Sequence, residues 1–199
     1  MLYLLKNLKR AICEDRPLTL FIIMRLAEIR VNKVLRPLEE MPVQAYYNET
    51  LQLIDVLEWI LSQVGRAKVW QTTFSMSNEF LSRMFQLRKN GKVEVTEHIL
   101  VLDERTTLKT RKLWQFMQNV IPEVYMARTH AKFALVEGAN GMKVTLLTSQ
   151  NLTRGNRYES ALVTCDEQVF DRLKREMQYV INFKSKSFHE LYRRTIEDY

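Results

Sequence analysis

The stretch from Thr129 to Glu159, THAKFALVEGANGMKVTLLTSQNLTRGNRYE, contains both a strand pattern and a set of reactive side chains. Residues 129–137 and 142–149 are rich in apolar and β-branched residues. Between them, the Gly-Ala-Asn-Gly segment at 138–141 is typical of a hairpin loop. We therefore expect two antiparallel strands joined by a short turn.

Four polar side chains accompany this hairpin at strand-like spacings. Alternate side chains of a strand share a face, so His130 and Lys132 are expected to point the same way, as are Ser149 and Asn151. This face would offer an imidazole, a cation, a hydroxyl and an amide. The combination suits a phosphodiester, whose cleavage needs a nucleophile, donors for the non-bridging oxygens and an acid for the leaving alkoxide.

Each side chain has a candidate role in that reaction. His130 would attack phosphorus, and Lys132 would place positive charge beside the phosphoryl oxygens. Ser149 and Asn151 would add hydrogen bonds, while Glu159 would orient His130 and fix its tautomer. A histidine bonded to phosphorus cannot also donate the proton, so a second histidine is needed. A second copy of the chain is the economical source, and we expect a homodimer.

The rest of the chain alternates between helical and strand patterns. Apolar residues recur at helical spacing from Asn48, the expected N-cap, to a stop at Gly65. The pattern then predicts a strand at 67–74, a helix at 77–90, a strand at 93–102, a helix around 113–120, a strand at 123–126, and, after the hairpin, a strand at 160–165 and a closing helix at 169–181. Strands separated by helices pair in parallel, so this order predicts an α/β domain.

The polar residues of the hairpin region also resemble a known signature. The run HAKFALVE at 130–137, followed by TSQNLT at 148–153 and then Asn156-x-x-Glu159, resembles the active-site signature of the phospholipase D superfamily. That signature is His-x-Lys, four residues, Asp, then Gly-Ser-x-Asn, with a downstream Glu. In this chain Glu137 stands where the family usually has Asp, and Thr148 stands where it usually has Gly.

The resemblance implies a mixed, mostly parallel sheet sandwiched by helices, a phosphohistidine intermediate and no required metal or other cofactor. Members with a single copy of the signature are typically homodimers, and many are nucleases. The resemblance therefore predicts a metal-independent phosphodiesterase, most simply a nuclease. Its catalytic residues would be His130, Lys132 and Glu159, and its substrate-binding residues Ser149, Asn151, Arg154 and Arg157. Glu137, the possible motif acid, is expected to anchor neighbouring backbone or a basic side chain.

Composition sets the broader limits. The 199 residues, 46% hydrophobic and 27% charged, suffice for one domain, which we expect at 44–199 after an N-terminal helical extension at 1–43. The net charge of +7 favours a polyanionic partner, nucleic acid first, with DNA expected ahead of RNA. The apolar run Leu18–Met24 is too short to cross a bilayer, and the two cysteines have neither disulfide-framework nor metal-ligand spacing. A cytoplasmic protein is expected.

Two other functions remain open at this stage. Glu137 and Thr148 motivate a catalytically silent nucleic-acid-binding module of the same fold, and the family also includes phospholipid headgroup hydrolases. Outside the signature, we expect His98 and His189 to be structural and Asp103 to cap the following helix. Tyr46, Tyr47 and the three tryptophans are expected in the core or at an interface.

Overall fold

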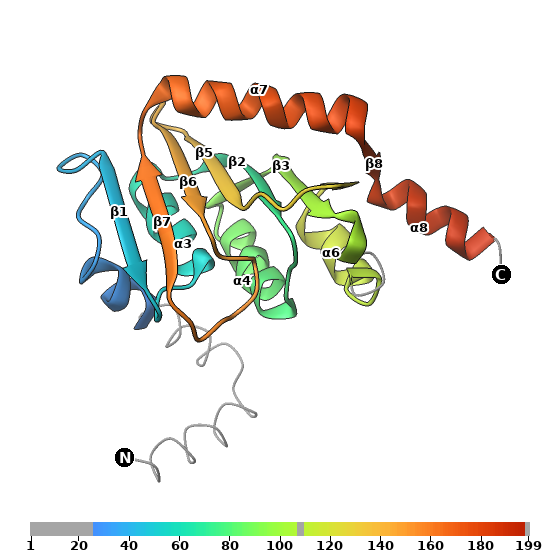
Figure 1. Cartoon of the computed structure of the whole chain (residues 1–199), viewed down its shortest axis with the longest axis horizontal. Helices are drawn as coiled ribbons and strands as arrows, with labels where there is room; N and C mark the ends of the chain where they lie inside the picture. The colour runs from blue at the N-terminus through green and yellow to red at the C-terminus, as the bar shows by residue number, and fades with distance from the viewer. Residues whose placement is uncertain (1–25, 107–109, 198–199) are drawn as a thin grey trace, which may run out of the picture.

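The computed structural model describes residues 26–106 and 110–197, so the run Leu18–Met24 lies outside the described residues. The described residues form one eight-stranded sheet in the order β1-β7-β6-β5-β2-β3-β4-β8 (Figure 1). The elements are β1 (Val43–Asn48), α3 (Leu53–Val64), β2 (Ala67–Thr73), α4 (Asn78–Lys89), β3 (Val93–Asp103), the 3-10 turn η1 (Glu104–Thr106), α6 (Trp114–Val120), β4 (Glu123–Ala127), β5 (Phe133–Gly138), β6 (Lys143–Thr148), β7 (Glu159–Thr164), α7 (Glu167–Lys184), β8 (Ser185–Ser187) and α8 (Phe188–Glu197).

The sheet is mixed. Strands β2, β3 and β4 run parallel and are connected through α4 and α6, as the alternating pattern predicts. Strands β5, β6, β7 and β1 continue the sheet beyond β2 in antiparallel pairs, and β8 pairs antiparallel with β4. The predicted hairpin is β5-β6, with Gly141 in its turn at φ 81°. The predicted α/β class, a mixed sheet sandwiched by helices, is confirmed. The expectation that the sheet is mostly parallel is wrong, because five of its seven strand pairs are antiparallel: the hairpin and the strands beyond it extend the sheet without crossover helices.

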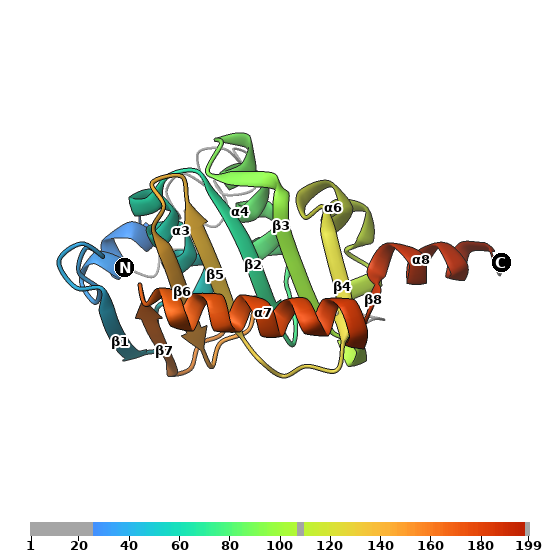
Figure 2. The ribbon, with the colours of Figure 1, turned by 90° about the horizontal axis from the view of Figure 1, so that it is seen from above.

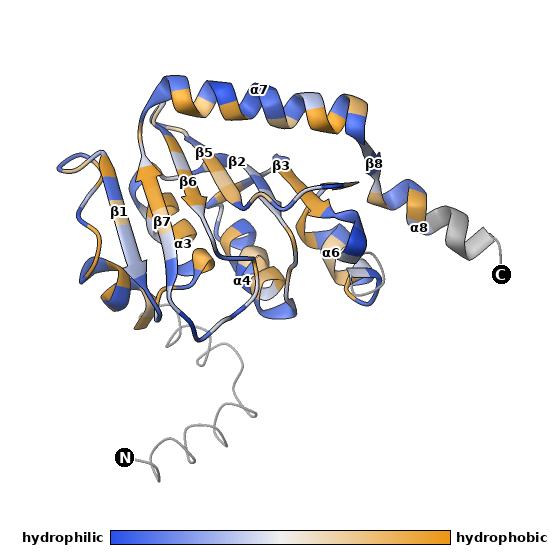
Figure 3. Cartoon of the chain, in the orientation of Figure 1, coloured by the Kyte–Doolittle hydropathy of each residue, from blue (hydrophilic) through white to orange (hydrophobic). Residues whose placement is uncertain are grey.

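Helices cover both faces of the sheet. On one face α3, α4 and α6 enclose the larger core, which includes Leu57, Phe80, Leu100 and Met117. On the other face α7 crosses the strands (Figure 2) and covers a smaller cluster around Trp70, with Phe170 and Met177. In Figure 3, α7 alternates between hydrophobic and hydrophilic residues, as expected of a helix with one face on the sheet.

The start of α3 differs from the prediction. Asn48 ends β1 instead of capping a helix, because its side-chain Oδ1 accepts hydrogen bonds from the backbone N–H groups of Thr50 (2.7 Å) and Leu51 (3.1 Å). The helix begins at Leu53, after Gln52, whose backbone N–H donates to Asp55 Oδ2 at 3.1 Å. The predicted stop is correct, since the glycine that follows α3 has a φ of 75°.

A buried ion cluster fixes α4 on α3. Arg83 of α4 is almost fully buried and reaches two carboxylates of α3. It donates to Asp55 Oδ1 at 2.6 Å, to Glu58 Oε1 at 2.8 Å and also to Glu58 Oε2. With all three charges paired, the cluster avoids the large penalty of an unpaired buried charge.

Strand β1 was not predicted, because its buried positions are Gln44 and Tyr46 rather than aliphatic residues. The buried amide of Gln44 hydrogen-bonds to the backbone N–H and C=O of Arg36, both at 2.7 Å. Preceding it, Val31, Leu35 and Leu38 are buried in the larger core. The part of residues 1–43 that the structure describes is thus packed on the same core as residues 44–197. Among the described helices, none is long and apolar enough to cross a membrane.

His98 lies in β3, fully buried as expected of a structural histidine. Its Nε2 is 3.1 Å from Oε1 of Gln71 on the neighbouring strand β2. Burial, with a smaller contribution from the charge of Arg88, lowers the pKa of His98 from 6.5 to about 3. The folded protein therefore keeps this imidazole neutral at pH values where the unfolded chain binds a proton.

The depressed pKa predicts a pH-dependent stability. As pH falls from about 6.5 towards 3, the free energy of unfolding should fall by about 1.4 kcal/mol per unit because of His98, since only the unfolded state takes up the proton. Between pH 7 and pH 5, urea unfolding should show the wild type losing about 2 kcal/mol more than a His98→Gln variant. Equal losses in the two proteins would contradict this assignment.

Candidate active site

The predicted site residues lie at one edge of the sheet. The parallel strands β2, β3 and β4 end there, and β5 begins there, since Thr72 of β2 is paired with Phe133 of β5. The same edge holds the end of β6 and the start of β7, where Thr148 is paired with Ala161. The two loops that carry the predicted residues, 128–132 and 149–158, are therefore neighbours. Figure 2 shows the first of them running along this edge from β4 to β5.

The prediction that His130 and Lys132 lie on a strand is wrong. Strand β5 begins at Phe133, and Ser149 and Asn151 likewise follow the end of β6 at Thr148. The reason is topological: β4 and β5 are separated by β3 and β2, so the connecting segment 128–132 crosses the ends of those strands. Contacts at the sheet edge, rather than strand alternation, therefore orient these side chains.

Asp103 holds the crossing segment. It is the last residue of β3 and is fully buried, and its Oδ2 accepts the backbone N–H of Thr129 at 3.1 Å. Arg105 donates to Oδ1 at 2.8 Å through Nε and to Oδ2 at 3.0 Å through a terminal nitrogen. The hydrogen bond from Arg105 is the main cause that lowers the pKa of Asp103. Asp103 Oδ1 also accepts the backbone N–H of Arg105 at 2.9 Å, so Asp103 caps the 3-10 turn η1 as predicted. In addition it fixes the residue immediately before His130, a role that sequence reasoning missed.

His130 is exposed and lies beside an aromatic ring and an ammonium group. Its ring meets that of Phe74 edge-on, with centroids 5.4 Å apart, and the Arg105 guanidinium lies over the same Phe74 ring at 5.0 Å. Lys132 Nζ is 3.3 Å from His130 Nδ1 and donates to the His130 backbone carbonyl at 2.7 Å. The predicted proximity of imidazole and ammonium is therefore present, although both side chains come from a loop.

Glu159 organises the second loop. Its carboxylate is buried, accepts a hydrogen bond from Ser149 Oγ, and accepts another from Arg157 Nε at 2.8 Å. The backbone N–H of Ser160 donates to Ser149 Oγ at 3.0 Å. The expected hydrogen bond from His130 to Glu159 is absent among the described residues, where Ser149 and Arg157 are the side chains that donate to this carboxylate.

Lys132 interacts with the second loop through a backbone hydrogen bond and through the charges of Glu159 and Arg157. Its backbone carbonyl accepts the N–H of Thr148 at 3.1 Å, which ties the crossing segment to the end of β6. Burial lowers the pKa of Lys132, the charge of Arg157 lowers it further, and the charge of Glu159 opposes both effects. No ion pair joins Lys132 to a carboxylate among the described residues. A partly buried ammonium without such a partner favours binding of an anion.

The end of β2 anchors Asn151. The hydroxyl of Thr73 lies 3.4 Å from Asn151 Oδ1 and accepts the backbone N–H of Leu152 at 3.2 Å. The Leu152 carbonyl in turn accepts the N–H of Ser77, the residue that caps α4. Because both backbone groups of Leu152 are bonded to the β2-α4 connection, the loop after β6 is held at a fixed position beside β2.

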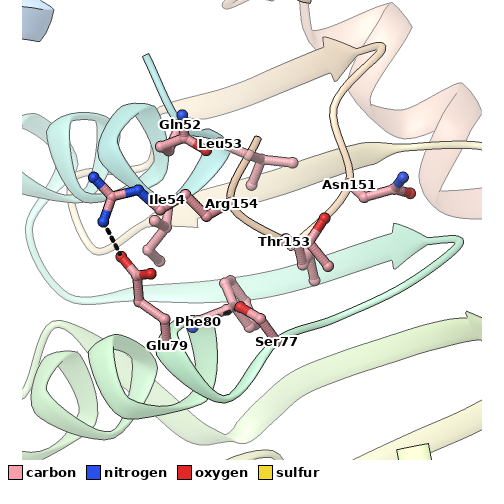
Figure 4. Close-up of a pocket in the computed structure, with 10 residues that line it drawn as sticks. Gln52, Leu53, Ile54, Ser77, Glu79, Phe80, Asn151, Thr153 and Arg154 are labelled. Atoms are coloured by element: carbon pink, nitrogen blue, oxygen red, sulfur yellow. Dashed lines mark hydrogen bonds and ion pairs between the residues drawn. The ribbon is translucent and has the colours of Figure 1, made fainter. Parts of the chain in front are cut away.

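The two arginines differ in their surroundings. Asn151, Arg154, Arg157 and Glu159 all line one hollow at the surface of the loop 150–157. Arg154 also borders a small adjacent pocket between the first turns of α3 and α4, where it forms an ion pair with Glu79 at 3.7 Å (Figure 4). Arg157 belongs to the Glu159 cluster, whereas Arg154 lies on the α4 side of the loop.

The two departures from the family pattern have ordinary structural partners. Glu137 lies at the opposite end of β5 from His130, and its Oε2 accepts a hydrogen bond from Lys174 of α7 at 3.1 Å. This is the basic side chain that was expected. The Thr148 hydroxyl donates to the Ser160 carbonyl and accepts the N–H of Gln150, both at 3.1 Å. Among the described residues, no hydrogen bond joins either side chain to His130.

The other two of the chain's three histidines do not contribute to this edge. His98 is buried in the sheet, and His189 of α8 lies 3.3 Å from the Pro122 carbonyl with its ring against Trp114. Within the described part of the chain, no group of three or more His, Cys, Asp or Glu side chains is arranged to hold a metal ion. Asp103, Phe74 and Thr73 are the supporting residues that the sequence motif did not indicate.

Comparison with known proteins places the fold. No family model matches the sequence, and no curated protein matches it. Among solved structures, the chain is similar to Nuc from Salmonella typhimurium, a phospholipase D family member, at 18% identity and a TM-score of 0.52, over 73% of this chain and 96% of that one. It is also similar to NucT from Helicobacter pylori (15% identity, TM-score 0.54, 73% and 98% covered). A third similar structure is phosphatidylserine synthase from Haemophilus influenzae Rd KW20 (17% identity, TM-score 0.51, 75% and 41% covered).

The Asp103 contact leads to a prediction about local order. Asp103→Ala removes the acceptor of a partly buried backbone N–H, so it should destabilise the protein by about 1–3 kcal/mol and accelerate amide hydrogen exchange across 128–132. Asp166→Ala is the matched control, because Asp166 accepts the N–H groups of Gln168 and Val169 at the start of α7. Exchange in 128–132 should not change in the control, and unchanged exchange there in Asp103→Ala would contradict the assigned role.

Proposed function

This chain has the phospholipase D fold, and we propose that it is a phosphodiesterase that cleaves nucleic acid with His130 as nucleophile. The observation that supports this most directly is the pairing of exposed His130 with Lys132, a partly buried ammonium that makes no ion pair with a carboxylate among the described residues. A phosphoryl group at this position would meet a nucleophile and a cation together.

The proposed reaction has two steps. An imidazole nitrogen of His130 forms a bond to phosphorus while the bond from phosphorus to the leaving oxygen breaks, and that oxygen takes a proton from a general acid. Water then attacks phosphorus and gives a proton to the same group, which now acts as a general base, and the nitrogen–phosphorus bond breaks to return free His130. Neither step requires a metal ion or an organic cofactor. Each positioned acid or base of this kind accelerates the reaction about 10²- to 10⁴-fold.

Three further side chains are assigned to the phosphoryl oxygens. Lys132 supplies positive charge, and the Asn151 amide donates a hydrogen bond from its place beside β2. Ser149 would donate to phosphate by exchanging its present hydrogen bond to Glu159. Glu159, which remains paired with Arg157, then acts as a positioning residue for this side of the site.

The general acid is proposed to be His130 of a second copy of the chain. While one His130 is bonded to phosphorus it cannot protonate the leaving oxygen, and both His98 and His189 lie elsewhere. A two-fold symmetric homodimer would bring two His130 rings to one phosphate from opposite sides. The site on one chain is thus proposed to be half of a shared site.

The proposed substrate is nucleic acid, with DNA ahead of RNA. The net charge of +7 supports a polyanion, and Arg154 and Arg157 expose most of their side chains beside the site. Nuc and NucT, with which the chain shares its fold, are covered almost completely by the match. Phosphatidylserine synthase is matched over only 41% of its length.

Replacing His130 tests the chemistry. A His130→Ala variant should hydrolyse bis(p-nitrophenyl) phosphate and a single-stranded DNA oligonucleotide at least about 10³ times more slowly than wild type in the presence of EDTA, because the nucleophile is absent. His189→Gln is the control and should retain activity. Rapid acid quench of the wild type should trap phosphohistidine at residue 130. Full activity of His130→Ala, or loss of wild-type activity on adding EDTA, would refute the mechanism.

Mixing subunits tests the shared site. Wild type and His130→Ala, unfolded and refolded together in equal amounts, should give about one quarter of the activity of the same total amount of wild type, because only wild-type pairs contain both histidines. Independent sites would give about one half, and that result would rule out a composite site. Wild type unfolded and refolded together with His189→Gln is the control, because every dimer then contains two His130 residues. Its activity shows how much is regained after refolding.

A further inference from the structure

Two tyrosines are exposed and stacked on each other beside the proposed active site. Tyr47 of β1 and Tyr158, just before β7, are 73% and 56% exposed, so of the two places expected for Tyr47, the core and an interface, the core is excluded. Their ring centroids are 5.0 Å apart, with 30° between the ring planes. The two rings therefore stack on each other, while more than half of the surface of each residue remains exposed to solvent.

Strand register places this tyrosine pair next to the second loop of the site. In the β1-β7 ladder Asn48 is paired with Glu159 and Tyr47 with Ser160. Ser160 donates its backbone N–H to Ser149 Oγ, and Glu159 accepts from Ser149. Paired residues of antiparallel strands have Cα atoms about 4.5–5.5 Å apart. The tyrosine pair is thus one strand away from side chains assigned to the phosphate.

Positive charge accompanies the two rings. Arg157 directly precedes Tyr158, and its side chain is 70% exposed although its Nε donates to Glu159. Arg154 of the same loop is 62% exposed. Exposed aromatic rings beside cations are the combination that binds single strands, in which bases stack on rings while phosphates contact the basic side chains.

We propose that Tyr47 and Tyr158 form a stacking platform for an unpaired nucleobase of the strand whose phosphate is held at His130. This inference rests on the proposed function and adds a substrate class to it, single-stranded nucleic acid. The two rings already contact each other, so a base extends the stack on an open ring face rather than inserting between them. Both faces of a base within a duplex are already covered by its neighbours, so the platform selects unpaired bases. Because every base has a π-face, the platform tolerates any sequence.

Binding measurements with and without bases test the platform. In the His130→Ala background, which prevents cleavage, fluorescence anisotropy gives the Kd of a labelled oligothymidylate and of an abasic strand of equal length. Tyr47→Ala and Tyr158→Ala should each raise the Kd for oligothymidylate by about tenfold, which corresponds to about 1.4 kcal/mol. The Kd for the abasic strand, which has the same phosphates, should change less than twofold. Tyr47→Phe and Tyr158→Phe keep the ring and should restore oligothymidylate binding.

Tyr179→Ala is the matched control, because Tyr179 is also an exposed tyrosine in an aromatic pair, with Phe183 on α7. It should leave both Kd values unchanged. Equal losses for the base-bearing and abasic strands, or no loss for either, would overturn the platform. So would a change from dimer to monomer in light scattering of Tyr47→Ala or Tyr158→Ala, since that would make the rings a contact between copies.

The proposed function is measured separately on bis(p-nitrophenyl) phosphate, which has no nucleobase. If wild type hydrolyses it in a His130-dependent manner while the tyrosine variants bind oligothymidylate normally, the platform is wrong and the phosphodiesterase stands. If no hydrolysis occurs but the tyrosine variants lose base-dependent binding, the catalytic proposal is wrong and the platform is supported as part of a binding module.

Discussion

The site depends on a single crossing segment. Strand β4 pairs with β3, but the next strand along the chain, β5, pairs with β2, so the chain must pass three strand spacings to continue the sheet. At about 4.8 Å per spacing this is about 14 Å, and the chain from Ala127 to Phe133 reaches at most about 20 Å. The segment therefore lies extended along the carboxyl edge of the parallel strands. The segment crosses the end of β3, where the buried Asp103 accepts the N–H of Thr129. This hydrogen bond fixes the position of His130, the next residue along the chain.

The surrounding contacts hold this edge from both sides. Thr73, the last residue of β2, hydrogen-bonds to the loop that carries Asn151, and Phe74, which follows β2, lies against the His130 ring. From β6, Thr148 reaches the Lys132 carbonyl. Behind the sheet, the buried ion cluster of Arg83 fixes α4, whose capping serine bonds the same loop. A long, mobile loop would not fix an imidazole relative to an ammonium, whereas these short connections are bonded to strand ends whose positions the core determines.

The sequence predicted those features that depend on local periodicity. The hairpin, the parallel strands and their helices follow from apolar spacing and from glycines that stop helices, and the residue types of the site follow from the motif. Strand order is not local, so nothing in the sequence indicated that residues 128–132 cross two strand ends, and His130 was wrongly placed on a strand. Strand β1 was missed because its inward residues, Gln44 and Tyr46, show no aliphatic alternation. The partners of Glu159 and Asp103 depend on side chains that only the folded chain brings together.

The arrangement around Glu159 suggests why a carboxylate can lie so close to a proposed phosphate. An unpaired buried carboxylate would repel the substrate and would itself be costly to desolvate. Here one oxygen is bonded to Arg157 and the other to Ser149, so its charge is largely balanced within the loop. If Ser149 turns its hydroxyl towards a phosphoryl oxygen, Glu159 still keeps its arginine, and the serine oxygen still accepts the N–H of Ser160. The exchange therefore leaves the Glu159 carboxylate paired, and Lys132 gains an anionic partner in the phosphate.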